Sequence, residues 1–287
     1  MVFLEDLEHP ESALILNDGS IIISEAGKER GCLIRVSASG KKRHIFARLD
    51  RPGGLLQNPY DGSIWVTETR QSSVLRLNSD GSLAERFSGD SDTPLLWPNG
   101  MTLGPDGAIY LTDSGIRVTD LITAGRANPD IWEGPMQGKL FRLDPISKQL
   151  DCLDDGFRFA SGIAFAPDGK LYISESVTGN IYRYPFTDRL EVASRERFVT
   201  VTDAAGPCRV AGPDGITFDT EGNLYVAMFG QGHVATVTAN GDIQRTIVTR
   251  GSCPMDVIFG GKDNNRLYIT EYQRGRVEMV EVSASIR

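Results

Sequence analysis

Histidine and cysteine are scarce in this chain of 287 residues, which has three of the former and four of the latter. The four cysteines, Cys32, Cys152, Cys208 and Cys253, include no C-x-x-C pair, and this spacing argues against a zinc site or a disulfide framework. We therefore expect free, mostly buried thiols. Cys208 and Cys253 fall in the loops that lead into neighbouring blades, so a disulfide between them is the alternative.

Long apolar runs are also absent. No stretch approaches the ~20 apolar residues of a membrane helix, and the first six residues are too acidic for a secretory signal. Acids outnumber bases, which gives a net charge of −8 and a pI near 5.0. This balance argues against a nucleic-acid or anionic-membrane surface. The absences together predict a cytoplasmic protein that binds neither membranes nor nucleic acids.

A repeated phrase dominates the sequence: an Asp-Gly turn, then a short apolar strand that ends in Ser or Thr and an acid. The phrase occupies residues 18–25, 61–68, 106–113 and 168–175, with altered copies at 221–228 and 266–271. Asp-Gly tolerates the positive φ angles of a tight hairpin, and repeats built only of short strands and turns are typical of β-propellers. Six copies predict an all-β fold, a six-bladed propeller with four antiparallel strands per blade, as one domain over residues 1–287.

The two ends of the chain and the third blade depart from this repeat. No outer strand fits after the last third strand, near residue 280, so we expect Val2–Asp6 to pair with the C-terminal blade and close the ring. In the third blade, residues 114–137 form an insertion longer than in the other blades. Long loops on repeat scaffolds are usually functional or disordered. Trp132 and Met136 favour an ordered lid, and a surface excursion is the alternative.

Polar residues recur eight positions before the turn glycines, where each inner strand begins. They are Glu11, Asn99, Ser161 and Asp214, whereas the second blade has Gly53 or Gly54 there and the sixth has Met255. Four oxygen-bearing side chains should therefore point at one axis, and two buried carboxylates need a counter-ion. We predict one divalent metal ion on these four residues, with Ca²⁺ best suited to all-oxygen ligation and Mg²⁺, Mn²⁺ or Zn²⁺ as alternatives. Hydrogen-bonded capping of the strand starts is the interpretation without a metal.

Several motifs carry a family resemblance. They are Pro10-Glu11-Ser12-Ala13, Pro98-Asn99-Gly100-Met101 with Thr112-Asp113-Ser114-Gly115, and Gly212-Pro213-Asp214-Gly215-Ile216. With them the chain resembles the senescence marker protein/gluconolactonase/luciferin-regenerating-enzyme family of six-bladed propellers over essentially its whole length. That family binds one divalent metal through a Glu, two Asn and an Asp, which map onto Glu11, Asn99, Ser161 and Asp214. Ser161 departs from the pattern, because the family has Asn there.

The resemblance implies hydrolysis of a small-molecule lactone, with the metal polarising the ester carbonyl. Asp214 would then activate water or attack directly. We expect substrate contacts from His9, Asp113, Arg117 and Trp132. For Asp113 and the other acids that end the second strands, binding of loop amides is the alternative; for Arg117 it is a solvated surface position.

Two other functions remain open. The first is hydrolysis of organophosphates or other esters on the same metal site. The second is a non-catalytic binding propeller, against which the buried axial carboxylates argue. The sequence leaves the oligomeric state open.

Overall fold

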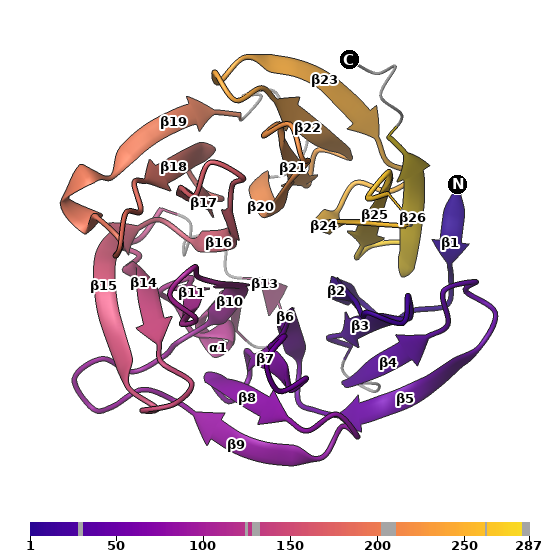
Figure 1. The fold of residues 1–287 in the computed structure, drawn as a ribbon, viewed down its shortest axis with the longest axis horizontal. Coiled ribbons are helices and arrows are strands. Elements are labelled where there is room, and N and C mark those ends of the chain that lie inside the picture. Colours follow the sequence, from indigo (N-terminus) through magenta and orange to yellow (C-terminus); the bar gives the residue numbers. More distant parts are fainter. Residues whose placement is uncertain (28–30, 124–125, 128–132, 202–210, 262, 283–287) are drawn as a thin grey trace.

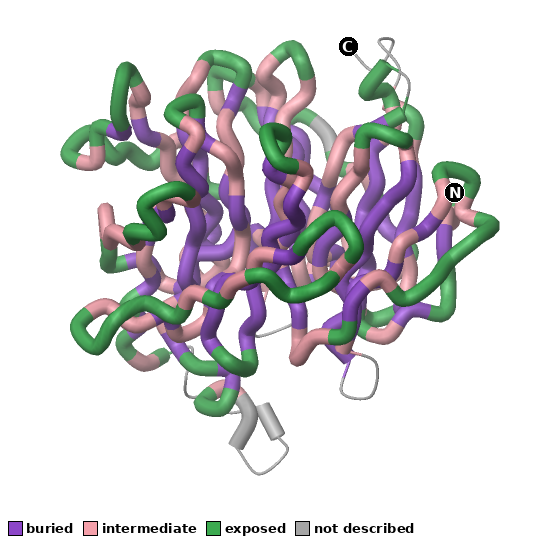
Figure 2. The backbone as a smooth tube through the Cα atoms, turned by 60° about the horizontal axis from the view of Figure 1, so that its bottom comes forward, coloured by how far each residue is buried: buried purple, intermediate pink, exposed green. Residues whose placement is uncertain are grey.

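The computed structural model describes residues 1–27, 31–123, 126–127, 133–201, 211–261 and 263–282. Six antiparallel four-stranded sheets stand around a central axis (Figure 1), which confirms the predicted six-bladed β-propeller. Strands follow one another outward from the axis in chain order, except in the sixth blade. Buried residues fill the strands between the blades and exposed residues gather in the outer loops (Figure 2).

The strands are named by their place in the blade. The inner strands are β2 (Pro10–Ile15), β6 (Pro52–Gln57), β10 (Pro98–Leu103), β16 (Ala160–Phe165), β20 (Gly212–Phe218) and β24 (Pro254–Gly260). The second strands are β3 (Ile21–Glu25), β7 (Ile64–Glu68), β11 (Ile109–Asp113), β17 (Leu171–Glu175), β21 (Leu224–Phe229) and β25 (Arg266–Glu271). The third strands are β4 (Cys32–Val36), β8 (Ser73–Leu77), β14 (Gly138–Leu143), β18 (Asn180–Tyr184), β22 (His233–Val237) and β26 (Arg276–Glu281). The outer strands are β5 (Arg43–Arg48), β9 (Leu83–Phe87), β15 (Leu150–Phe157), β19 (Glu196–Thr200), β23 (Ile243–Val248) and β1 (Val2–Leu4).

The sixth blade is completed by the N-terminal strand, as the sequence predicts. β1 pairs antiparallel with β26, and Val2 lies opposite Glu278. The Met1 amino group also donates to the carbonyl of Met279 at 2.6 Å. Leu4 is buried in a cluster that joins the first and sixth blades. The ring is therefore closed by strand pairing between the two ends of the chain.

The hydrophobic core lies between blades. The described residues form six such clusters, each joining one blade to the next. In the second-to-third interface, for example, Trp65 and Val74 pack with Ile109, Leu111 and Phe141, all fully buried. Both faces of the second strands are covered in this way, because side chains alternate between faces along a strand. This explains why these strands read as continuous apolar runs.

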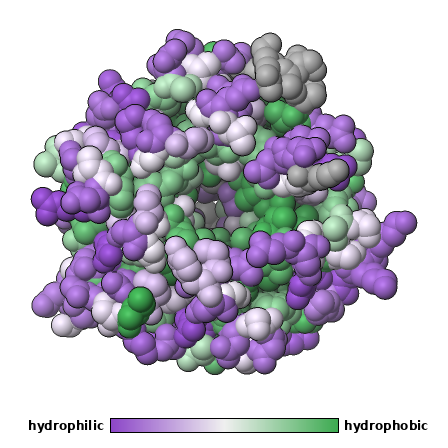
Figure 3. All heavy atoms as spheres, viewed as in Figure 1, coloured by the Kyte–Doolittle hydropathy of each residue, from purple (hydrophilic) through white to green (hydrophobic). Residues whose placement is uncertain are grey.

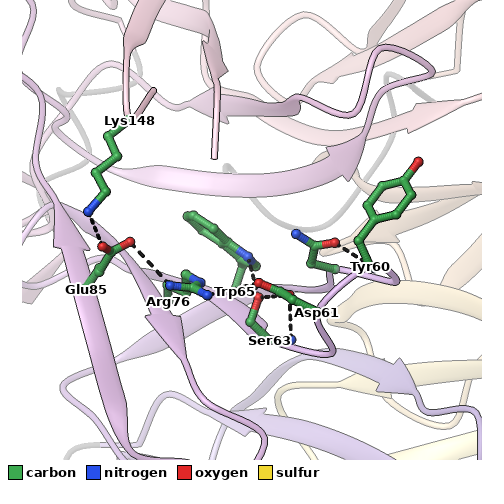
Figure 4. A network of polar contacts seen from close by, with 8 residues as sticks. Tyr60, Asp61, Ser63, Trp65, Arg76, Glu85 and Lys148 are labelled. Atoms are coloured by element: carbon green, nitrogen blue, oxygen red, sulfur yellow. Dashed lines mark hydrogen bonds and ion pairs between the residues drawn. The ribbon is translucent and has the colours of Figure 1, made fainter. Parts of the chain in front are cut away.

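The Asp-Gly turns are held by their own polar groups. Asp61 Oδ1 accepts from the Ser63 amide at 2.9 Å, and Gly62 has the positive φ, 71°, that the turn requires. Asp61 also pairs with Arg76 at 2.9 Å, in a network that continues through Glu85 to Lys148 of the third blade (Figure 4). Its members are partly exposed, so we expect only a small contribution to stability. The main role of the turn aspartate is local.

Part of the third-blade insertion has regular structure. It begins with α1 (Val118–Leu121) and the short paired strands β12 (Ile122–Thr123) and β13 (Arg126–Ala127). Met136, near its end, is buried with Ile116 and Phe159 against Trp97. The role of the insertion as a lid over the site stays a prediction. A further short element, a 3-10 helix at Val192–Ser194, precedes β19. In the described part of the chain, none of the helices has the length and apolar character needed to span a bilayer.

Candidate active site

Bulges at the start of the inner strands aim side chains at the axis. In β10, Pro98 pairs with Asp113 and Met101 with Leu111, so Asn99 and Gly100 together face one residue. A bulge of this kind twists the strand and redirects a side chain. The first, second, fourth and fifth blades show the same shift between the corresponding pairs.

The redirected side chains line a central channel. Glu11, Asn99 and Asp214 form part of the wall of a cavity of about 410 Å³. The space-filling view shows the ring hollowed at its centre (Figure 3). We call the end of the channel where the inner strands begin the mouth. The structure therefore brings together three of the four residues predicted to bind metal in the channel wall.

The Ser or Thr of the repeated phrase ties five of the six bulges to the preceding blade, and the fifth copy has Ala227 at this position. Thr67 Oγ1 donates to the carbonyl of Asn99 at 2.9 Å, and Ser174 Oγ donates to that of Asp214 at 2.7 Å. The same bond joins Thr270 to Glu11, Ser24 to Gly53 and Thr112 to Ser161. The repeated hydroxyl thus fixes the backbone of the axial residues.

The acid that ends each repeated phrase differs in role from the hydroxyl residue before it, as Asp113 shows. Its Oδ2 accepts from the amides of Leu96 (2.7 Å) and Trp97 (3.0 Å), and its Oδ1 accepts from Gly115 (2.9 Å). The residue is 1% exposed. Burial raises the pKa of this carboxyl, and the three amides oppose that shift. Asp113 therefore holds the loop before β10, the alternative considered for it, and its predicted contact with substrate gains no support.

Ser161 lies beside the channel rather than in its wall. It is fully buried, with its Oγ 2.8 Å from Ser176 Oγ and 3.4 Å from Asn99 Nδ2. The Ser161 hydroxyl also opposes the rise in the pKa of the Asp214 carboxyl that burial causes. Asn99 Nδ2 donates to Ser114 Oγ as well, at 3.2 Å. In the described residues these bonds use only the amide nitrogen, so Oδ1 of Asn99 is left as a ligand atom.

Three carboxyl groups share the channel. Burial raises the pKa of Glu11 to about 7, with Arg51 opposing the shift and Asp256 adding to it. Burial, followed by Glu11 and Asp256, raises the pKa of Asp214 well above its ordinary value. Burial raises that of Asp256 to about 6, despite its bond from Ser12. None of these carboxyls forms an ion pair with another described residue.

Asp256 was missed by the sequence analysis, which placed Met255 in the sixth position. Here only Met255 is left unpaired in the bulge, because Asp256 pairs with Thr270 directly. At the equivalent position after the axial residue, four blades have glycine, where a Cβ would meet the next blade's backbone; at Gly162 it would lie 2.3 Å from the Asp214 carbonyl. Ser12 and Asp256 take this place in the first and sixth blades and hydrogen-bond to each other at 2.6 Å. The absence of glycine at these two positions was the sequence signal from which Asp256 could have been found.

The other residues predicted to contact substrate lie in different places. His9 is exposed just before β2, and its ring stacks on Tyr272 with centroids 4.3 Å apart. Arg117 is exposed at the start of α1, where its amide donates to Asp120 Oδ2 at 3.2 Å. Trp132 and Cys208 lie outside the described residues, so the contact predicted for Trp132 and the disulfide alternative for Cys208 stay predictions.

The fold and axial residues agree with a match to a known family. A family model described as "SMP-30/Gluconolactonase/LRE-like region" matches residues 23–273. The chain belongs to the SMP-30/gluconolactonase/LRE-like family. This confirms the family resemblance found in the sequence.

Relatives in this family include proteins named as lactonases. The chain is 31% identical to a pentonolactonase from Haloferax volcanii over 238 residues, 78% of this chain and 72% of that protein. It is 28% identical to a gluconolactonase from Zymomonas mobilis over 261 residues, 84% of this chain and 67% of that protein. A match to an uncharacterised Sulfolobus acidocaldarius protein, 33% identical over 139 residues, covers 46% of this chain and only 47% of that relative.

Solved structures show the same fold. A calcium-binding protein, regucalcin, from Agrobacterium tumefaciens superposes with a TM-score of 0.77 at 18% identity, over 97% of this chain and 92% of that one. At this identity the likeness concerns the fold alone.

The donor set suits a hard divalent cation. Glu11 and Asp214 offer carboxylate oxygens and Asn99 an amide oxygen, and the channel supplies no described cation to pair with the two acids. Among the described residues, no three His, Cys, Asp or Glu side chains are grouped closely enough to hold a metal by themselves. A metal at the axis of this family member would therefore depend on the amide of Asn99 together with the two carboxylates.

Proposed function

We propose that this protein is a divalent-metal-dependent lactonase that hydrolyses small lactones at the axial site. The observation that carries the proposal is the convergence of Glu11, Asn99 and Asp214 on the channel, with raised carboxyl pKa values and no ion-pair partner among the described residues. The relatives named pentonolactonase and gluconolactonase support a lactone as the substrate. A cavity of about 410 Å³ is in the range of small-molecule sites.

Each residue has a distinct role in this proposal. When bound, a divalent cation supplies Lewis-acid polarisation of the ester carbonyl. Glu11 and Asn99 would hold it, and Asp214 would be both ligand and base. Asp214 accepts a proton from water as the water oxygen bonds to the carbonyl carbon, and it returns that proton to the ring oxygen as the C–O bond breaks. The Ser161 hydroxyl, which favours the charged form of Asp214, would help to orient that carboxylate. Direct attack by Asp214 is the alternative.

Ca²⁺ is the cation that we propose, because all the donors are oxygen atoms. The regucalcin neighbour, described as a calcium-binding protein, is consistent with this choice. The alternatives are Mg²⁺, Mn²⁺ and Zn²⁺, and organophosphates or other esters remain alternative substrates.

A panel assay tests the function. The purified protein is incubated with γ- and δ-lactones of pentonic and hexonic acids, and acid release is followed at constant pH. We expect turnover that EDTA abolishes and that Ca²⁺ restores best among Ca²⁺, Mg²⁺, Mn²⁺ and Zn²⁺. An organophosphate triester and a simple aryl ester are run alongside. Turnover of these, but of no lactone, would replace the proposal by its alternative, and no turnover at all would favour a binding protein.

The raised pKa values predict a pH-dependent effect of metal on stability. Without metal, the folded chain keeps its carboxyl protons to higher pH than the unfolded chain does. The raised pKa values therefore contribute to the free energy of unfolding in full below about pH 4, and this contribution is lost as pH rises through 6 to 7. For Glu11 alone the loss is roughly 3 kcal/mol. Metal binds the deprotonated groups and should offset it.

Melting temperatures from pH 5 to 8, in EDTA or saturating Ca²⁺, measure this effect. We expect the rise in Tm caused by Ca²⁺ to be small at pH 5 and to grow towards pH 8. Asp256→Asn is the matched control: it keeps the bond to Ser12 but removes one charge, so the loss of stability in EDTA should shrink. A Ca²⁺ effect that is independent of pH would contradict the axial carboxyls as the binding groups.

A further inference from the structure

We propose that Arg51 binds an anionic substituent on the substrate, so that the enzyme prefers lactones that carry a carboxylate or a similar acid group over their neutral counterparts. The inference rests on the proposed lactonase function. It concerns a second layer of residues at the mouth, outside the axial carboxyls.

The repeat places this second layer by register. Two positions before the axial residue, the first four blades carry His9, Arg51, Trp97 and Phe159. The carbonyl of each accepts the amide of the residue that follows the acid of the second strand: Ala26 for His9 (3.0 Å), Thr69 for Arg51 (3.1 Å), Ser114 for Trp97 (2.9 Å) and Ser176 for Phe159 (3.0 Å). Equivalent backbone bonds put these residues at equivalent places around the mouth.

Backbone geometry marks the same positions. Arg51 has φ 60°, Phe159 φ 68° and His9 φ 55°, left-handed values that cost energy in residues other than glycine. The Asp50 amide beside Arg51 is also fixed, because it donates to Glu68 Oε1 at 2.8 Å. Strain of this kind persists only where the surrounding contacts over-determine it, and it is a reason to look for a function.

The guanidinium of Arg51 is held in place but has hydrogen-bonding capacity to spare. Its Cζ lies 5.9 Å from the centre of the Trp97 ring, and the guanidinium opposes the rise in the pKa of Tyr272 that burial and Glu11 cause. Its Nε is buried and has no hydrogen-bond partner among the residues that the structure describes. The guanidinium lies close enough to Glu11 to lower the pKa of that carboxyl, yet no ion pair of the described residues joins them. A fixed arginine with an unused, buried N–H is suited to a ligand oxygen.

The mouth is chemically uneven, which gives a ligand one orientation. Trp97 and Phe159 meet edge to face with centroids 5.5 Å apart, and Phe159 belongs to an apolar cluster with Ile116 and Met136. This aromatic side can pack on the C–H face of a sugar-derived ring, while Arg51 meets a charged group at the ring's other end. A planar guanidinium pairs with a carboxylate through two parallel hydrogen bonds. An acidic lactone uses both features, and a neutral one uses only the first.

Two lactones that differ only in charge test the inference. D-Glucono-1,4-lactone and D-glucaro-1,4-lactone share the ring and its hydroxyls, but C6 is an alcohol in the first and a carboxylate in the second. Kinetics are measured for the parent, Arg51→Gln and Arg51→Lys with saturating metal. Arg70→Gln is the matched control. Arg70 is exposed, and it pairs at 3.1 Å with Asp50, the residue that directly precedes Arg51.

We expect the parent to have a lower KM for the glucarolactone, and Arg51→Gln to raise that KM about tenfold or more. Its KM for the gluconolactone, and its Ca²⁺ affinity by calorimetry, should stay near the parent values. Arg51→Lys should have an intermediate KM for the glucarolactone, because it keeps the charge but loses the planar guanidinium that forms two parallel hydrogen bonds.

Equal effects of Arg51→Gln on both lactones, or weaker Ca²⁺ binding, would show that Arg51 acts only through Glu11 and would overturn the inference. A parent that prefers the neutral lactone would also overturn it. Hydrolysis of neither compound, with no hydrolysis elsewhere in the lactone panel, would instead count against the lactonase function itself.

Discussion

Asp214→Asn should lower kcat for lactone hydrolysis by at least ~10², the lower end of what a positioned general base contributes. The substitution keeps an oxygen of nearly the same shape at the axis and removes the charge and the basicity. The backbone should not move, because the carbonyl of Asp214 stays bonded to Ser174 Oγ at 2.7 Å. The measurement is kcat at saturating Ca²⁺, beside a calorimetric titration on the same samples.

Two comparisons make this result specific. Asp242→Asn removes a carboxylate from an exposed turn of the same blade and should leave kcat and Ca²⁺ affinity unchanged. Without metal, Asp214→Asn should also be more stable than the parent at neutral pH, because it removes a buried acid whose charged form is disfavoured. An Asp214→Asn enzyme that binds Ca²⁺ normally and turns over lactone at the parental rate would exclude Asp214 as the base.

The repeated phrase made the fold predictable, because its two periodic signals have direct structural causes. Aspartate and glycine form the hairpin turn, as at Asp61 and Gly62. The apolar run is buried on both faces between blades. The hydroxyl and the acid were recognised as a pattern, but their partners lie outside the repeat, in the next blade for Thr67 and in the preceding loop for Glu68. A sequence pattern shows that such residues recur and leaves open what they bind.

The candidate site could be predicted from the sequence only where the functional residue lies eight positions before the turn glycine. Counting from the turn glycine found Glu11, Asn99 and Asp214 because their blades share the two-residue bulge. It missed Asp256, which stands one residue after the counted position, where four other blades have glycine. It also placed Ser161 among the ligands, a role that stays a prediction, since its short side chain is buried with its Oγ 3.4 Å from Asn99 Nδ2 and 2.8 Å from Ser176 Oγ. Arg51 was not considered, since a lone arginine before a strand carries no signal until its neighbours are known.

Deleting residues 1–6 should make the protein insoluble or lower its Tm by about 10 °C or more. The deletion removes β1 from β26, takes Leu4 out of the cluster between the first and sixth blades, and takes Phe3 off Tyr268, whose ring centre is 5.2 Å away. Each large apolar side chain lost from a core costs roughly 2–5 kcal/mol. The sum is a sizeable part of a typical unfolding free energy of ~5–15 kcal/mol, and about 5 kcal/mol corresponds to such a shift in Tm.

A transplanted strand separates loss of closure from general damage. In the truncated chain, residues 2–6 are attached after residue 287 through a short Gly-Ser linker, so that they can return antiparallel along β26. Because closure depends on strand pairing and not on the direction from which the strand arrives, we expect this variant to recover most of the lost Tm and solubility. The full-length double variant Phe3→Ala and Leu4→Ala keeps the strand backbone and loses only the packing, so it should fall between the two. A truncated protein that melts like the parent would show that the ring does not depend on β1.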